Sequence, residues 1–139
     1  MRLLGLDIGE ARVGVAVSDP GRTIASPVAV LDGRRLVRDI APLRELVEEY
    51  EVVGLVVGLP LGMGGTEGAQ ALLVRDIAAR FALELALPVA FCDERLSSRE
   101  ASRAMSGGGV SSKRQRGRLD MVAAALILQA YLDGQRRAD

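Results

Sequence analysis

One uninterrupted apolar run constrains the fold of this chain more than any other feature of its sequence. Residues 52–59 read VVGLVVGL, and Pro60 ends the run. The apolar positions are consecutive rather than alternate, which is typical of a strand that is buried on both faces. Such strands lie in parallel sheets between layers of helices. The run therefore predicts an α/β fold with 52–59 as an interior strand.

Three shorter apolar runs precede this strand and predict an antiparallel meander. They cover 3–8, 14–17 and 23–31, and the Asp19-Pro20-Gly21 turn separates the second run from the third. Three strands so close together are typical of consecutive hairpins.

Helical periodicity follows the meander. One amphipathic helix is expected to begin near Asp39, with Pro42 in its first turn. A second helix is expected after Thr66, its predicted N-cap, with Leu73, Ile77 and Phe81 on its buried face. The remaining predicted elements are a fifth strand at 88–92, a short helix at 97–105, and a last helix at 119–132 with Gly134 past its end.

This order of elements predicts an α/β fold of the ribonuclease H-like class. Its five-stranded mixed sheet would consist of a three-strand antiparallel meander plus two parallel strands, flanked by helices. The 139 residues match one typical domain, so we expect residues 1–139 to form a single domain. No apolar run approaches the ~20 residues of a membrane span and no signal-peptide pattern is present, so we expect a cytoplasmic protein without membrane contact.

The absence of histidine narrows the chemistry of this chain. Ser-His-Asp triads and histidine zinc sites are excluded, and the single cysteine, Cys92, excludes an internal disulfide. We expect Cys92 to be a small buried apolar residue. Hydrolytic chemistry would depend on carboxylates, hydroxyls, Arg or Lys, or a metal ion held by oxygen.

Two acidic residues lie in apolar surroundings. Alternation places Asp7 on one face of the first strand with Leu3 and Gly5, and helical spacing places Asp120 with Ile127 on the packed side of the last helix. A buried charge is costly unless it is paired or binds a metal. Two simpler interpretations stay open: Asp7 caps a turn at the strand end, and Asp120 is a first-turn acid favoured by the helix dipole.

A second pair of acids, Asp93 and Glu94, directly follows the fifth strand. Alternation sends them to opposite faces, and spacing alone does not choose which one points toward Asp7; a turn role for both is the alternative. Three converging carboxylates would bind Mg²⁺ or Mn²⁺. Two such ions would activate a water and stabilise the leaving oxygen of a phosphodiester.

Positive charge is concentrated between residues 95 and 118. Seven basic residues against Glu100 give this segment a net charge of +6 (7 − 1), so the rest of the neutral chain carries −6. The segment predicts a polyanion partner at one face, and a solvated arginine-rich loop is the alternative. Its basic residues are Arg95, Arg99, Arg103, Lys113, Arg114, Arg116 and Arg118.

Four motifs, in the same order along the chain, resemble the YqgF family. The match spans essentially the whole sequence, which makes it specific. The matching motifs are 6–9 with 12–19, 57–61 with 65–68, 93–98, and a C-terminal block made of Lys113, Asp120, 123–124 and 127–132.

The resemblance implies a ribonuclease H-like nuclease. Family members are described as enzymes that process the 5′ end of pre-16S rRNA and as Holliday junction resolvases. By motif position, Asp7, Glu94 and Asp120 would be the catalytic, metal-binding acids for Mg²⁺ or Mn²⁺. Arg12, Thr66, Arg95 and Lys113 would face the nucleic acid, and in the basic segment Arg99, Arg114, Arg116 and Arg118 would join them.

A fourth acid is found in some junction-cleaving members of the fold. The nearest candidate here, Asp133, lies about three and a half helical turns beyond Asp120, so a three-acid centre is expected. The four aromatic residues all resemble core residues, which leaves shape and phosphates as the basis of recognition.

Two other classes of function are alternatives to a nuclease. One is a nucleic-acid-binding factor in transcription or ribosome assembly that does not cleave. The other is a sugar-kinase or actin-like ATPase, suggested by Asp7-x-Gly9, but those enzymes need two lobes. The choice between pre-rRNA and branched DNA stays open, as does a homodimer, which would suit the symmetry of a four-way junction.

Overall fold

The computed structural model describes residues 1–97 and 113–138. Within them lies the expected five-stranded mixed sheet, in the order β3-β2-β1-β4-β5. β2 is antiparallel to both β1 and β3, whereas β4 is parallel to β1 and β5 is parallel to β4. The strands are β1 (Arg2–Ile8), β2 (Arg12–Ser18), β3 (Ala25–Asp32), β4 (Val52–Leu59) and β5 (Val89–Asp93).

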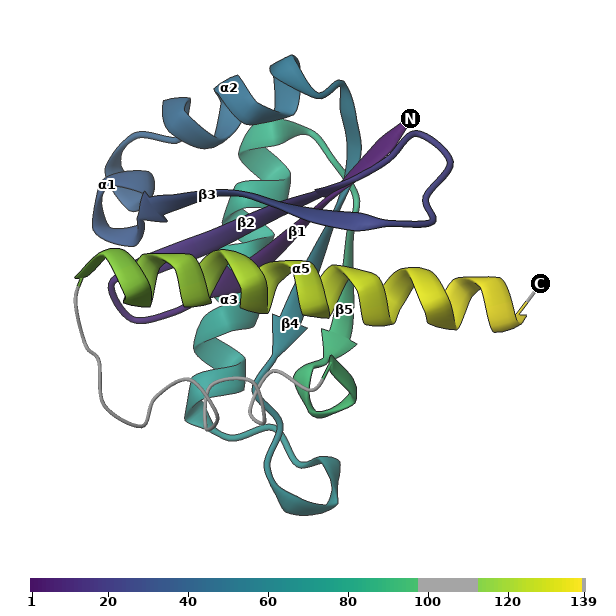
Figure 1. Cartoon of the computed structure of the whole chain (residues 1–139). Coiled ribbons are helices and arrows are strands. Elements are labelled where there is room, and N and C mark those ends of the chain that lie inside the picture. Colours follow the sequence, from purple (N-terminus) through teal and green to yellow (C-terminus); the bar gives the residue numbers. More distant parts are fainter. Residues whose placement is uncertain (98–112, 139) are drawn as a thin grey trace.

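Helices cover both faces of the sheet (Figure 1). One face packs against α1, α2 and α3, and the other packs against the long α5. The helices are α1 (Gly33–Arg38), α2 (Ala41–Glu49), α3 (Ala69–Leu85) and α5 (Lys113–Ala138), and the short 3-10 turns are η1 (Met63–Gly65) and η2 (Glu94–Ser97). None of the helices in the described ranges is long and apolar enough to span a membrane.

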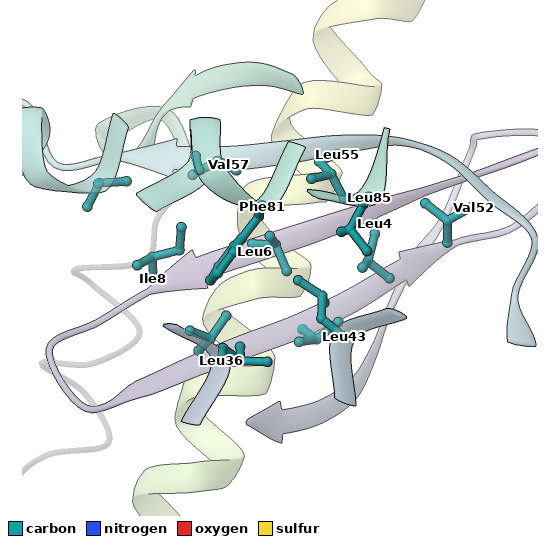
Figure 2. Close-up of a cluster of buried hydrophobic side chains, with 14 of the residues drawn as sticks. Leu4, Leu6, Ile8, Leu36, Leu43, Val52, Leu55, Val57, Phe81 and Leu85 are labelled. Carbon is teal, nitrogen blue, oxygen red and sulfur yellow. The ribbon is translucent and has the colours of Figure 1, made fainter. Parts of the chain in front are cut away.

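The two cores follow from side-chain alternation along the strands. Leu4, Leu6 and Val57 point to the larger cluster, where Figure 2 shows them beside Leu36 of α1 and Phe81 of α3. Residues of the opposite parity form the second cluster under α5. Its buried members are Leu3, Ala16, Val56, Cys92, Ala124, Ile127, Leu128 and Leu132.

Glycines on the second face let α5 lie close to the sheet. A Cβ atom built on Gly14 would stand 2.0 Å from the carbonyl oxygen of Asp120, and one on Gly58 would stand 2.6 Å from Cδ1 of Ile127. Real Cβ atoms essentially never make contacts this short. The missing side chains therefore fix how closely α5 crosses the sheet.

The region after β3 differs in part from its sequence prediction. The helix predicted near Asp39 is α2, which starts at Ala41 with Pro42 in its first turn. A separate helix, α1, precedes it and was not predicted. Its start is explained by Asp32, whose carboxylate accepts hydrogen bonds from the backbone N–H groups of Arg34 and Arg35 at 3.0 and 3.3 Å.

Two further predictions about helices were wrong. Thr66 is not an N-cap, because α3 begins at Ala69 and its N-cap, Gly68, makes no side-chain capping bond. Leu73 is 53% exposed, and the buried face of α3 is formed by Ala71, Val74, Ala78, Phe81 and Leu85.

The C-terminal elements are also longer or shorter than predicted. α5 starts by Lys113 and continues through Gly134 to Ala138, beyond the predicted 119–132. Of the short helix predicted at 97–105, Ser97 ends η2, and 98–112 lie outside the described residues together with Arg99 and Arg103.

Candidate active site

Asp7 lies near the end of β1 on the face that α5 covers. It shares that face with Gly5, whose nearest neighbours are Leu128 and Ala124 of α5. The side chain is buried, with 4% of the residue exposed. Its Cα partner on the antiparallel strand β2 is Gly14. Asp7 therefore points into the layer between sheet and helix, as alternation predicted.

Asp120 reaches the same place from α5. Its backbone lies directly against Gly14, the strand partner of Asp7, and the residue is 8% exposed. Because paired antiparallel residues lie about 4.5–5.5 Å apart, the two acids are neighbours over Gly14. Asp120 is the eighth residue of α5, in its third turn, so a first-turn dipole role does not explain it.

The structure separates Asp93 from Glu94. Asp93 is half-buried at the end of β5, and Arg95 binds its carboxylate through Nε (2.9 and 3.0 Å) and Nη2 (2.5 Å). The Arg95 hydrogen bonds lower the pKa of Asp93 below its usual 3.8. Glu94 is 7% exposed and lies in η2, which packs against α5. Glu94, not Asp93, is therefore the buried acid.

Ser97 supports this turn in a way that the sequence prediction missed. Its hydroxyl donates to the backbone carbonyl of Glu94 at 2.6 Å, and the residue is 4% exposed. The sequence predicted the start of a short helix at Ser97, whereas Ser97 is the last residue of η2. A serine three residues after a buried acid is the signal that could have indicated a closed 3-10 turn instead.

Arg12 provides the positive charge next to Asp120. Its Nε donates to Oδ2 of Asp120 at 2.6 Å, and the side chains of Arg12 and Asp120 are 40% and 12% exposed. Arg12 is the first residue of β2, one β-turn away from Asp7. The pair lowers the cost of burying Asp120 and leaves one side of the guanidinium in contact with solvent.

The structure describes the positions of only some of the other residues predicted to contact nucleic acid. Arg95 directly follows Glu94 in the chain, and its Nη1 donates to the Gly62 carbonyl at 3.2 Å. Arg95 thereby approaches the loop that carries the exposed Thr66. Arg118 is exposed on α5. The first turn of α5 contains Lys113, Arg114 and Arg116, whose side chains are outside the described part.

Three other polar or reactive groups lie outside this cluster. Asp133 binds Gln129 and Arg136, and these hydrogen bonds lower its pKa. Burial raises the pKa of the Cys92 thiol, as expected for a residue that fills the core. Asp19 organises the turn between β2 and β3, far from the ends of β1 and β5.

The acids suit a hard divalent cation by their chemistry. Carboxylate oxygens are the ligands that Mg²⁺ and Mn²⁺ prefer, and this chain has no histidine to offer. In the residues that the structure describes, no three acidic or cysteine side chains are already grouped to hold a metal ion. Asp120 is instead paired with Arg12. Glu94 follows β5, which stands two strands away from the β1 strand of Asp7, about 10 Å across the sheet.

Comparison with known proteins places the sequence in one family. The family model RuvX, described as "Holliday junction resolvase", matches residues 1–134. A relative from Syntrophomonas wolfei, named "Putative pre-16S rRNA nuclease", is 45% identical over 134 residues, covering 96% of this chain and 95% of the relative. A relative with the same name from Anaeromyxobacter dehalogenans (strain 2CP-C) is 47% identical over 138 residues, covering 99% of each.

The fold agrees with this placement. The structure titled "T. thermophilus RuvC in complex with Holliday junction substrate" superposes with a TM-score of 0.61 at 16% identity, covering 98% of this chain and 96% of that one. This likeness confirms the ribonuclease H-like fold that the order of elements predicted. The chain belongs to the RuvX (YqgF) family and is a nuclease, a hydrolase that acts on ester bonds.

Proposed function

We propose that this nuclease uses divalent metal ions, Mg²⁺ or Mn²⁺, to hydrolyse phosphodiester bonds at the 5′ end of pre-16S rRNA. The observation that carries the metal centre is the meeting of two buried acids, Asp7 and Asp120, over Gly14. The names of the curated relatives support the substrate. The proposal takes residues 1–139 as one nuclease domain acting in the cytoplasm.

The proposed ligands of the metal are Asp7, Glu94 and Asp120. Bound divalent ions would supply an activated water and stabilise charge on the phosphate. The chain's own part would be to bring these three carboxylates together on the α5 side of the sheet, where each of the three residues is buried.

The proposed contacts to the nucleic acid come from cationic residues around these acids. Arg12 would donate to a substrate phosphate with the exposed side of its guanidinium, since arginine forks match phosphate geometry. Arg95 and Thr66 would contact the strand at the ends of β4 and β5. We propose that the basic residues Arg99, Lys113, Arg114, Arg116 and Arg118 also hold the nucleic-acid backbone.

A cleavage assay tests this function. Purified protein is incubated with Mn²⁺ or Mg²⁺ and a 5′-extended pre-16S rRNA fragment, beside Asp120→Asn and the control Asp133→Asn, which alters an acid on the same helix outside the cluster. We expect the wild type and Asp133→Asn to trim the RNA, and Asp120→Asn to lose at least about 100-fold in rate. Full activity of Asp120→Asn, or trimming in EDTA, would refute the metal centre.

A second candidate substrate is a four-way DNA junction. The family description and the RuvC fold favour it. The same assay with a synthetic junction decides, because preferential cleavage of the junction over the RNA would assign the enzyme to DNA recombination. Binding of either substrate with no cleavage by any metal, together with an Asp7→Ala variant that keeps its cellular role, would indicate a factor that binds without cutting.

A further inference from the structure

A groove lies beside Arg12 of the candidate active site, at the end of β3. Its volume is about 470 Å³, within the ~300–1,000 Å³ of ligand-sized clefts. Its lining includes Arg12, the residue that binds Asp120, and Arg34 in α1. The lining residues are Ala11, Arg12, Val30, Leu31, Asp32 and Arg34. The groove and the site therefore share Arg12.

The groove opens toward a helix with three exposed arginines, Arg34, Arg35 and Arg38. Across 1–97 and 113–138, none of these three guanidiniums takes part in an ion pair. The acids that flank α1 are occupied elsewhere: Asp32 accepts from backbone N–H groups of α1, and Asp39 accepts from the Ala41 N–H at 3.0 Å. Positive charge on α1 is therefore available to a partner.

The arginines of α1 are presented on a fixed element. Leu36 is 1% exposed and anchors α1 to the larger core, as Figure 2 shows. Arg34 and Arg38 are four residues apart and so lie on one side of the helix. α5 packs close to Val30, one of the lining residues, since a Cβ on Gly117 would stand 3.7 Å from its side chain.

We propose that this groove and the α1 arginines bind the phosphates of the nucleic-acid strand as it leaves the active site. The inference rests on the proposed nuclease function and extends the substrate path beyond residues 95–118 to a second basic surface. Guanidinium groups bind phosphate oxygens in bidentate fashion. Contacts of this kind position a strand and carry no sequence information. The surface therefore holds the strand and fixes its register, without selecting a sequence.

Binding at varied salt concentration tests the inference in the full-length protein. The variant Arg34→Ala/Arg38→Ala is compared with Arg136→Ala/Arg137→Ala, which also removes two positive charges, but at the far end of α5 (Figure 1). Alanine is the strongest helix former, so both variants keep their helices, and circular dichroism melting verifies this. The probes are a 5′-extended pre-16S rRNA fragment and a four-way DNA junction, in EDTA to prevent cleavage.

We expect the α1 variant to bind its preferred probe on the order of tenfold more weakly. The slope of log affinity against log salt should shrink by about 1.4–1.8, which corresponds to two lost phosphate contacts at about 0.7–0.9 each. The control should keep the wild-type slope. Equal slopes for the two variants would overturn the inference.

The outcome is separable from that of the proposed function. If Asp120→Asn abolishes cleavage while the α1 variant binds as the wild type does, the groove is wrong and the nuclease centre stands. If the α1 variant loses binding while the wild type cleaves neither probe with any metal, the surface stands and the proposed function is wrong.

Discussion

At the scale of single residues, the contact between Arg12 and Asp120 links the buried acids to the surface. A carboxylate that is almost covered needs a compensating charge, and Arg12 supplies it at 2.6 Å while its own side chain stays 40% exposed. The same carboxylate is a proposed metal ligand. A divalent ion bound there would compete with the guanidinium for Asp120, and the arginine freed in this way would be available to a phosphate.

This competition predicts the effect of Arg12→Gln on metal binding. We expect the variant to bind Mn²⁺ a few-fold more tightly, because an ion pair at a partly exposed site contributes roughly 0.2–1 kcal/mol. The measurement is titration calorimetry without nucleic acid. Arg136→Gln, which removes another arginine paired with an acid on α5, is the control. A lower Mn²⁺ affinity in Arg12→Gln than in the wild type would contradict this expectation, because it would show that the arginine promotes metal binding.

Asp19 predicts a pH dependence of stability. Hydrogen bonds from the Ile24 N–H and from the Thr23 hydroxyl and N–H lower its pKa from 3.8 to about 2. A lowered folded-state pKa stabilises the fold above the unfolded-state value, and this contribution is lost as pH falls through the folded-state value.

We therefore expect Asp19→Asn to be less stable than the wild type at pH 7, and the difference to shrink between about pH 4 and pH 2. Urea unfolding across this range measures it, with Asp76→Asn as the control for loss of one exposed charge. A difference that stays constant down to pH 2 would mean that the carboxylate bonds contribute nothing.

At the scale of elements, the site depends on how closely α5 crosses the sheet. Gly14 has no side chain where the Asp120 backbone passes, so Asp120 reaches the strand partner of Asp7. Any side chain at this position would lift the helix and separate the two acids. The spacing of the proposed metal ligands is thus set by backbone packing rather than by the acids themselves.

Two glycine substitutions in contact with or within α5 should have opposite effects. Gly14→Ala should lower the free energy of unfolding by about 1–3 kcal/mol through overpacking, because its Cβ would meet backbone at 2.0 Å. Gly134→Ala has nothing within 4 Å and should raise stability by up to about 1 kcal/mol through helix propensity. Urea unfolding measures both, and a fully stable Gly14→Ala would contradict the close crossing.

Sequence periodicity predicted the strands and their directions because burial on one or two faces leaves a direct trace in the pattern. Helix ends were predicted less well. α1 starts at a side-chain cap from Asp32, and α5 passes through Gly134, where a local preference of about 1 kcal/mol does not stop a helix with several packed turns. Alternation could not choose between Asp93 and Glu94, since the deciding contact is the binding of Arg95 to Asp93.

At the scale of the whole molecule, a neutral chain concentrates its positive charge in two segments of its sequence. The segment 95–118 carries +6, α1 adds three arginines, and buried acids meet between the sheet and α5. A polyanion is attracted to such cationic surfaces, and divalent ions would offset the crowded acids that the cleaved phosphate approaches. A nucleic-acid substrate of a nuclease would need both the cationic segments and the buried acids.

The most direct test is Mn²⁺ binding by the wild type and by single variants of the buried acids, measured by titration calorimetry without nucleic acid. We predict that the wild type binds Mn²⁺, that Asp7→Asn and Asp120→Asn each weaken binding by at least about tenfold, and that Asp133→Asn binds as the wild type does. Wild-type affinity in Asp7→Asn and Asp120→Asn would show that these acids hold no metal and would contradict the account.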